Sequence, residues 1–502
     1  MERRRSLGVI REATLRGLLR ALAIVANMIS GVILARKLPV ADYAIYQTAI
    51  KRVPAYASVL SAVTGYWAYR YLALKGKEAI SSHLTAVYVS GALGGILAAV
   101  IAVYMGSTSY AVTLLALGVL ATIVYSGCYS ASTGVQPVRS EISNFATRLI
   151  YAALVASLVY FLGSGIVGAA LSLLMSQFVG AVIIVSSFGR KGWLPGRKYV
   201  KEWLRGGWIP TLNWLSRVLL ALDAIIVYSL SGSYPVSAFF ASIIIASVMA
   251  EVAGVAIGHL QAFVLVSDDV KSAINLTRLL LLASAPVLGY SLARPEQLIS
   301  LMNPSYVAAA KTLSIYSIVV FLLNVFNPLG NLLMGLDKSS ADKPGRVLRE
   351  MAFLNFSSSL FYLLVLCLGL YLARGSTSLV LIVWPLSYVI FNLLRLSVLL
   401  TIAGRELAVE SLKRMILPGI FYLALSAVLS EIVAPVGYEE KFFSDLVLVL
   451  RGFLPSLAIF IALVLSIDGW SRETLNRALS KTVRGALGSD RLDDGIDKIE
   501  YR

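Results

Sequence analysis

The sequence predicts an all-α protein that crosses a membrane many times. Of its 502 residues, 58% are hydrophobic and only 14% are charged, which is more apolar surface than the cores of a soluble protein of this length bury. Apolar runs of about 20 residues recur along the whole chain, and each is long enough to cross roughly 30 Å of hydrocarbon as a helix. We therefore expect about fourteen transmembrane helices. They are placed at residues 15–36, 45–73, 83–105, 110–131, 141–162, 164–188, 205–230, 236–266, 274–293, 307–336, 351–373, 376–403, 415–433 and 447–467.

The connections between these runs alternate in charge. One set is short and nearly uncharged, and the other is longer and rich in Lys and Arg, at residues 190–205, 337–350 and 404–414. Basic loops stay on the cytoplasmic side, so we expect both termini to be cytoplasmic in a plasma-membrane protein. The net charge of +17 is thus interpreted as a topology signal and a contact with membrane lipids, and nucleic acid is not an expected partner.

Both ends of the chain carry basic flanks. Five arginines precede the first apolar run, which is full length and lacks a cleavage pattern, so we expect an uncleaved first helix. Near the other end, Leu475, Leu479 and Val483 recur every four residues among basic side chains. This pattern predicts an interfacial amphipathic helix within a cytoplasmic tail at 468–502.

Few residues are suited to metal or disulfide chemistry. Cys128 and Cys367 lie in apolar runs, and His83 and His259 are the two histidines. They form neither a disulfide framework nor a zinc pattern. A Walker-type phosphate loop is also missing from the sequence. We expect no metal site, no cofactor and no enzymatic activity, and a monomer with fourteen spans could function alone.

Charged residues within the predicted helices are the main functional signal, because each costs about 2.5–3.5 kcal/mol in hydrocarbon unless it faces water or a partner. Lys51 and Arg52 lie in the 45–73 helix, with Gln47 on the stripe of Lys51. Pro54 cannot donate its helical hydrogen bond and predicts a kink beside them. We expect these charges to line a cavity, although both could instead reach toward the membrane surface or pair with an acid such as Asp42.

The second half of the chain has a similar pair of polar residues. Asn213 and Arg217 share a helix face, and Arg148 is a shallower candidate from the first half. Two acids lie at depth, Asp223 and Glu251, and both are candidates for binding a coupling proton or sodium ion. Either acid could instead form a structural ion pair with Arg217. Arg395 lies nearer the inner surface and is interpreted as a lipid headgroup anchor.

Several segments resemble a known family of transporters. They are ARKLPVADYAIYQTA (35–49), GYWAYRYLAL (65–74), LALDAIIVYSLSGSYPVSAFFAS (220–242) and LMNPSYVAAAKTLSIYS (301–317). In this order and spacing they resemble oligosaccharide flippases of the multidrug/oligosaccharidyl-lipid/polysaccharide (MOP) exporter superfamily. The chain departs from the family pattern at three glycine positions, which here are Ala44, Ser237 and Asn303.

The resemblance implies a two-fold arrangement of helices. A weak internal repeat agrees, because LRG at 15–17 and 204–206 is followed in each half by a Pro-Val turn. We expect an N-terminal lobe at 1–190 and a C-terminal lobe at 191–403, each of six helices. Residues 404–467 then form two appended helices.

The sign of the buried charge favours an anionic substrate. Lys51, Arg52, Arg148 and Arg217 outnumber the two deep acids, and phosphate is matched by guanidinium and ammonium groups. We therefore predict a flippase that carries a lipid-linked oligosaccharide, on polyprenyl phosphate or pyrophosphate, to the outer leaflet by alternating access. The alternative is an ion-coupled multidrug or cation antiporter on the same fold. A polyprenyl-dependent membrane enzyme is a further rival, but the short external loops leave little room for a catalytic site.

Overall fold

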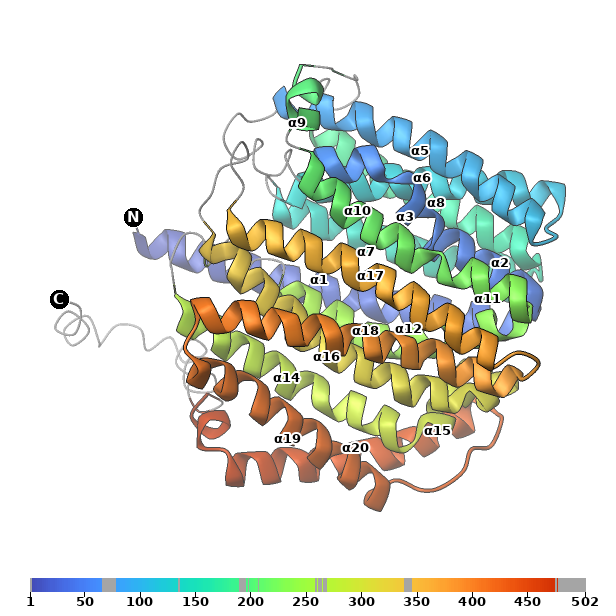
Figure 1. Cartoon of the computed structure of the whole chain (residues 1–502). Coiled ribbons are helices and arrows are strands. Elements are labelled where there is room, and N and C mark those ends of the chain that lie inside the picture. The colour runs from blue at the N-terminus through green and yellow to red at the C-terminus, as the bar shows by residue number, and fades with distance from the viewer. Residues whose placement is uncertain are drawn as a thin grey trace.

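The computed structural model describes residues 2–65, 78–133, 136–188, 196, 198–205, 207–257, 260, 264, 269–337, 345–474 and 476. Within this part of the chain every regular element is helical, and the long helices lie side by side along one direction (Figure 1). The elements of the first half are α1 (Glu2–Lys37), α2 (Val40–Lys51), α3 (Val53–Ala57), α5 (Glu78–Tyr104), α6 (Ser109–Thr133), α7 (Pro137–Leu154), the π-helical turn η1 (Val155–Phe161) and α8 (Gly165–Ser187).

The remaining elements follow in the same style. They are α9 (Val200–Arg205), α10 (Trp208–Ala221), α11 (Asp223–Ser231), α12 (Ser233–Ile257), α14 (Val270–Ala293), α15 (Pro295–Met302), the 3-10 turn η3 (Pro304–Ala309), α16 (Ala310–Leu336), α17 (Arg346–Leu372), α18 (Thr377–Glu406), α19 (Val409–Val433) and α20 (Phe442–Ile467).

The all-helical membrane architecture is confirmed. Twelve helices of the described chain are long and apolar enough to cross a membrane, and they coincide with twelve of the fourteen expected spans. The other two expected spans, 45–73 and 236–266, contain residues outside the described ranges, and α2, α3 and α12 occupy their described portions. Of the predicted tail at 468–502, residues 468–474 and 476 are described, and Leu475, Leu479 and Val483 of the expected amphipathic helix lie outside the described residues.

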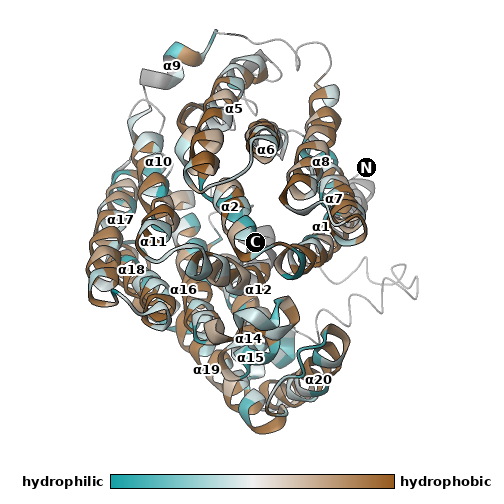
Figure 2. Ribbon diagram, turned by 90° about the vertical axis from the view of Figure 1, so that its right-hand side faces the viewer, coloured by the Kyte–Doolittle hydropathy of each residue, from teal (hydrophilic) through white to brown (hydrophobic). Residues whose placement is uncertain are grey.

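The helices pack in two groups that meet along α1, α2 and α12. In the first, α5 packs on α6, α6 on α8, and α7 on both α8 and α1. In the second, α10 packs on α17, α17 on α18, and α16 on α12, α14 and α18. Figure 2 shows the first group in the upper right and the second at the left and below. The division into two symmetric lobes at 1–190 and 191–403 stays a prediction.

The expected kink beside Pro54 is confirmed. Helix α2 ends at Lys51, and α3 begins at Val53 with proline in its first turn. Between them Arg52 has φ of −109° and ψ of −44°. The sequence therefore places a helix break directly at the second of the two adjacent charges.

The segments that resemble oligosaccharide flippases contact one another in the fold. Ser237, near the start of α12, donates a hydrogen bond from Oγ to the Val40 carbonyl at 2.6 Å. Asn303, between α15 and η3, donates from Nδ2 to the Ala35 carbonyl at 2.7 Å. Ser237 and Asn303 are two of the three positions where the chain departs from the family's glycines. Both side chains thus hold the turn between α1 and α2 against the second half of the chain.

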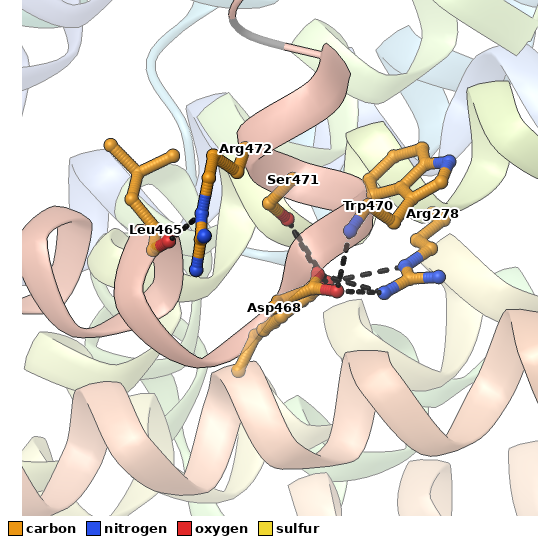
Figure 3. Close-up of polar contacts among 7 residues, drawn as sticks. Arg278, Leu465, Asp468, Trp470, Ser471 and Arg472 are labelled. Carbon is orange, nitrogen blue, oxygen red and sulfur yellow. Dashed lines mark hydrogen bonds and ion pairs between the residues drawn. The ribbon is translucent and has the colours of Figure 1, made fainter.

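A polar cluster fastens the appended helices to α14 (Figure 3). Asp468 follows the last residue of α20, and Arg278 of α14 donates from Nη2 to both of its carboxylate oxygens at 2.7 Å. Ser471 donates to Asp468 at 2.6 Å, and the phenol of Tyr422 on α19 donates to the same oxygen. The Arg278 guanidinium also lies 4.3 Å from the centroid of the Trp470 ring. One carboxylate therefore connects α14, α19 and the end of α20.

The protonation of Asp468 follows from these contacts. Burial disfavours the charged carboxylate, but hydrogen bonds from Ser471, Tyr422 and Arg278 outweigh burial and hold the pKa of Asp468 below its ordinary value. Because the folded-state pKa is lowered, the carboxylate stabilises the fold above its unfolded-state pKa of about 3.9. This contribution is lost as the pH falls through the folded-state pKa.

We predict that Asp468→Asn lowers the thermal unfolding midpoint near neutral pH and that this difference shrinks in acid. The midpoints of the wild type and the variant would be compared in detergent micelles from about pH 7 down to about pH 3. Glu410→Gln is the matched control, because its partner Arg414 lies 3.5 Å away in an exposed pair that is expected to contribute little. A difference for Asp468→Asn that stays constant over the whole range would contradict the prediction.

Candidate functional site

Arg52 and Asp223 form an ion pair between two interrupted helices. Arg52 lies at the break between α2 and α3, and Asp223 is the first residue of α11, after α10 ends at Ala221. The Arg52 Nη2 and Asp223 Oδ2 atoms are 2.7 Å apart, and the Asp223 side chain is fully buried. The alternatives weighed from the sequence, Arg52 with Asp42 and Arg217 with Asp223, are replaced by this pair.

The Asp223 carboxylate is surrounded by hydrogen-bond donors. Its Oδ2 atom accepts from the Tyr388 hydroxyl at 2.8 Å, from Trp384 Nε1 at 2.9 Å and from the Tyr362 hydroxyl at 3.2 Å. Its Oδ1 atom accepts from the Ala224 backbone N–H at 2.6 Å. Such a set offsets the cost of burying a carboxylate. Protein donors occupy both oxygens, so a coupling ion at Asp223 would have to displace some of them.

Two further hydrogen bonds connect the same two interrupted helices. Trp214 on α10 donates from Nε1 to the Ala55 carbonyl at 2.8 Å, and the Tyr56 hydroxyl on α3 donates to the Ala221 carbonyl. Ala55 and Ala221 each lie in the last turn before a helix interruption, where carbonyls lack an intrahelical partner. Each broken helix therefore supplies a side chain that satisfies a carbonyl of the other.

Lys51, Gln47 and Arg148 line one internal cavity, here called the first cavity. Its volume is about 180 Å³, and its walls come from α1, α2, α6, α7, α8 and α12. Arg148 donates from Nη1 to Asn27 Oδ1 at 2.6 Å. The Oε1 atoms of Gln47 and Gln177, both on the wall, accept no hydrogen bond from the described residues. The described lining contains two cations and no Asp or Glu.

Asn213 and Arg217 line a different cavity, here called the second cavity. Its volume is about 570 Å³, and α10, α16, α17 and α18 provide most of its walls. Arg217 is exposed to this space, with neither an ion pair nor a hydrogen bond to any described residue. The described lining again contains two cations and no acid, and the second cation is Arg395.

The sequence interpretation missed Arg395 as a residue of the second cavity. Its Nη2 atom donates to Asn355 Oδ1 at 2.6 Å, and Asn355 Nδ2 donates to Asn213 Oδ1 at 2.9 Å. Its guanidinium carbon lies 3.9 Å from the centroid of the Phe326 ring, a geometry that holds the cation in place. Arg395 therefore faces the same cavity as Arg217, although the sequence suggested a headgroup anchor.

A sequence signal for the second cavity was available. Asn327 and Asn331 lie four residues apart in an apolar stretch of α16, with the same spacing as Asn213 and Arg217 on α10, and all four line the cavity. Polar residues at this spacing share one face of a helix. Asn355 and Arg395 lack such neighbours and were visible only in the folded chain.

Not every predicted site residue lies at these cavities. Arg52, expected in the headgroup site, lines neither of them, because its guanidinium is directed to Asp223. Glu251 lies on α12, and its side chain is outside the described part of the structure. The roles of Arg52 in substrate binding and of Asp223 and Glu251 in ion coupling stay predictions.

We predict that Arg52→Gln and Asp223→Asn each lower the free energy of unfolding by about 3–5 kcal/mol, because each leaves an uncompensated buried charge. The double variant removes both charges and is expected to cost less than the sum of the single changes. A double-mutant cycle measured by reversible unfolding in detergent gives the coupling energy. The exposed pair Glu410 and Arg414 is the control, with an expected coupling below about 1 kcal/mol. Strictly additive costs for Arg52 and Asp223 would contradict the assigned pairing.

Comparison with known proteins gives matches among solved structures. No family model and no curated protein sequence matches the chain. An inward-facing MATE-family multidrug resistance transporter of the MOP superfamily is 14% identical, with 78% of this chain and 98% of that chain covered and a TM-score of 0.56. A MOP superfamily transporter from Pyrococcus furiosus, described as having a binding pocket of reverse polarity, is 16% identical, with coverages of 81% and 96% and a TM-score of 0.56.

A flippase structure has the same overall arrangement. The lipid II flippase MurJ in its inward closed conformation is 13% identical, with 91% of this chain and 99% of that chain covered and a TM-score of 0.61. These structural neighbours are transporters and flippases rather than enzymes. The chain therefore shares the fold of these solved structures.

Proposed function

We propose that this protein is a flippase for a lipid-linked oligosaccharide, which it moves from the cytoplasmic to the outer leaflet of the plasma membrane. One observation carries the proposal. The described linings of the first and second cavities contain the cations Lys51, Arg148, Arg217 and Arg395 and no carboxylate. A cavity of this sign attracts a phosphorylated headgroup and repels a cationic substrate.

The chemistry of the linings fits both parts of such a headgroup. Guanidinium and ammonium groups bind phosphate or pyrophosphate oxygens through charge-assisted hydrogen bonds. Carboxamides donate and accept hydrogen bonds and so match sugar hydroxyls. The described linings contain seven of them, at Asn27, Gln47, Gln177, Asn213, Asn327, Asn331 and Asn355. In this proposal Arg217, Asn213 and Arg395 act in the second cavity, and Lys51, Gln47 and Arg148 act in the first.

The proposed movement is alternating access between the two lobes, with the polyprenyl tail remaining in lipid. The membrane potential alone can contribute to it. A doubly charged headgroup that moves outward through about 100 mV, inside negative, gains roughly 4–5 kcal/mol if it crosses the full field. The neighbour MurJ is a lipid II flippase, which supports a lipid-linked substrate on this fold.

A cation or multidrug antiporter is the second candidate, because MATE multidrug transporters have the same fold and Glu251 lies on α12. It requires an acid exposed to the transport cavity, and drug-dependent proton flux would support it. The described linings of both cavities favour the flippase, because their charged residues are all cations and would repel a cationic drug.

We predict that purified protein in proteoliposomes moves a fluorescent polyprenyl-pyrophosphate oligosaccharide across the bilayer, and that Arg217→Gln and Arg395→Gln each slow the movement about tenfold or more. Each change removes a charge-assisted hydrogen bond worth about 1.5–3 kcal/mol. Arg374→Gln is the matched control, because Arg374 is exposed just after α17 ends at Leu372. All variants are first checked for an unchanged unfolding midpoint.

Two results would contradict the proposal. One is wild-type movement no faster than that of protein-free vesicles under imposed ion gradients and an imposed potential. The other is movement by Arg217→Gln and Arg395→Gln at the wild-type rate, which would remove the second cavity from the transport path.

A further inference from the structure

A basic groove runs between α17 and α18, apart from both internal cavities. Figure 2 shows these two helices at the left-hand edge of the molecule. The groove has a volume of about 730 Å³. Its α17 wall is one stripe, because the lining residues Arg346, Arg349, Phe353 and Ser357 recur every three or four positions. The groove therefore follows the helix axes for about three turns from the start of α17.

The groove changes from charged to apolar along its length. The charged groups lie in the first two turns of α17 and the last turn of α18, where Arg405 is found. Beyond them the walls are formed mainly by Phe353, Val398 and Ile402, and the Phe353 and Val398 side chains are 57% and 39% exposed. This order matches the profile of an amphiphile that lies with its polar group at a membrane surface.

The charged end has a surplus of arginine. Glu350 lies 2.7 Å from Arg346 and 3.5 Å from Arg405, so its carboxylate holds two guanidinium groups beside the groove. Arg349 is exposed and makes neither an ion pair nor a hydrogen bond with any described residue. Glu406 also lies near this end, because its charge acts on Arg346. With Glu406 counted beside Glu350, the three arginines of the groove still outnumber the two acids.

We propose that this groove is a binding site for an anionic phospholipid. Its phosphodiester binds Arg349 and Arg405, and one acyl chain lies along Phe353, Val398 and Ile402. Guanidinium groups bind phosphate oxygens through two parallel hydrogen bonds, and basic pockets between transmembrane helices bind anionic headgroups. The groove opens at the end of the molecule that the basic loop at 337–350 predicts to be cytoplasmic. The site is independent of the proposed transport substrate.

The test measures lipid binding by delipidated, detergent-purified full-length protein using native mass spectrometry. Phosphatidylglycerol and phosphatidylcholine with identical acyl chains are the probes. The wild type is expected to bind phosphatidylglycerol at least tenfold more tightly. The double variant Arg349→Gln/Arg405→Gln is expected to lose that preference, with binding of phosphatidylcholine unchanged. Arg414→Gln is the matched control and is expected to keep the preference, because Arg414 is an exposed arginine on α19, the next helix along the chain, and lies outside the groove.

A second variant separates loss of the site from loss of the fold. Thr401→Trp fills the groove but leaves its charges in place, and it is expected to weaken phosphatidylglycerol binding as strongly as the double variant. The proposal is overturned if the wild type binds both lipids equally or if Arg414→Gln reduces the preference as much as the double variant. It is also overturned if Thr401→Trp binds phosphatidylglycerol like the wild type.

Discussion

The ion pair between Arg52 and Asp223 is the constraint on which the rest of the site depends. It joins two helices at the points where both are interrupted, and a charge buried there without its partner would be strongly destabilising. The helices that it fixes also carry two of the four cavity cations. Lys51 immediately precedes Arg52, and Arg217 lies less than two turns before Asp223. The positions of Lys51 and Arg217 are therefore tied to this ion pair.

This arrangement explains how two adjacent positive residues occupy one membrane helix. Helix α2 ends at Lys51, which lines the first cavity, and at the break that follows, Arg52 is directed to Asp223 in the second half of the chain. The charge of Arg52 is balanced within the protein. Those of Lys51, Arg148, Arg217 and Arg395 face cavities whose described linings hold no acid. The charges on these helices thus divide into a structural pair and a set that is suited to an anionic ligand.

Much of this organisation is readable from local sequence patterns. Length and hydropathy locate the spans, Pro54 marks the break, and helical spacing places Gln47 on the stripe of Lys51. Contacts between distant segments are not contained in such patterns. Asp223 lies 171 residues from Arg52, and periodicity along one helix does not specify a partner on another. Arg395 is a similar case, since its contact with Asn355 depends on how α17 packs against α18.

The central claim is that the cavities accept an anionic headgroup, and binding selectivity tests it most directly. Isothermal titration calorimetry on the wild type would compare a water-soluble sugar diphosphate, the same sugar without phosphate and a quaternary ammonium compound. The account predicts binding of the sugar diphosphate alone, with an affinity that falls as salt is added. Binding of the quaternary ammonium compound without binding of the sugar diphosphate would contradict it.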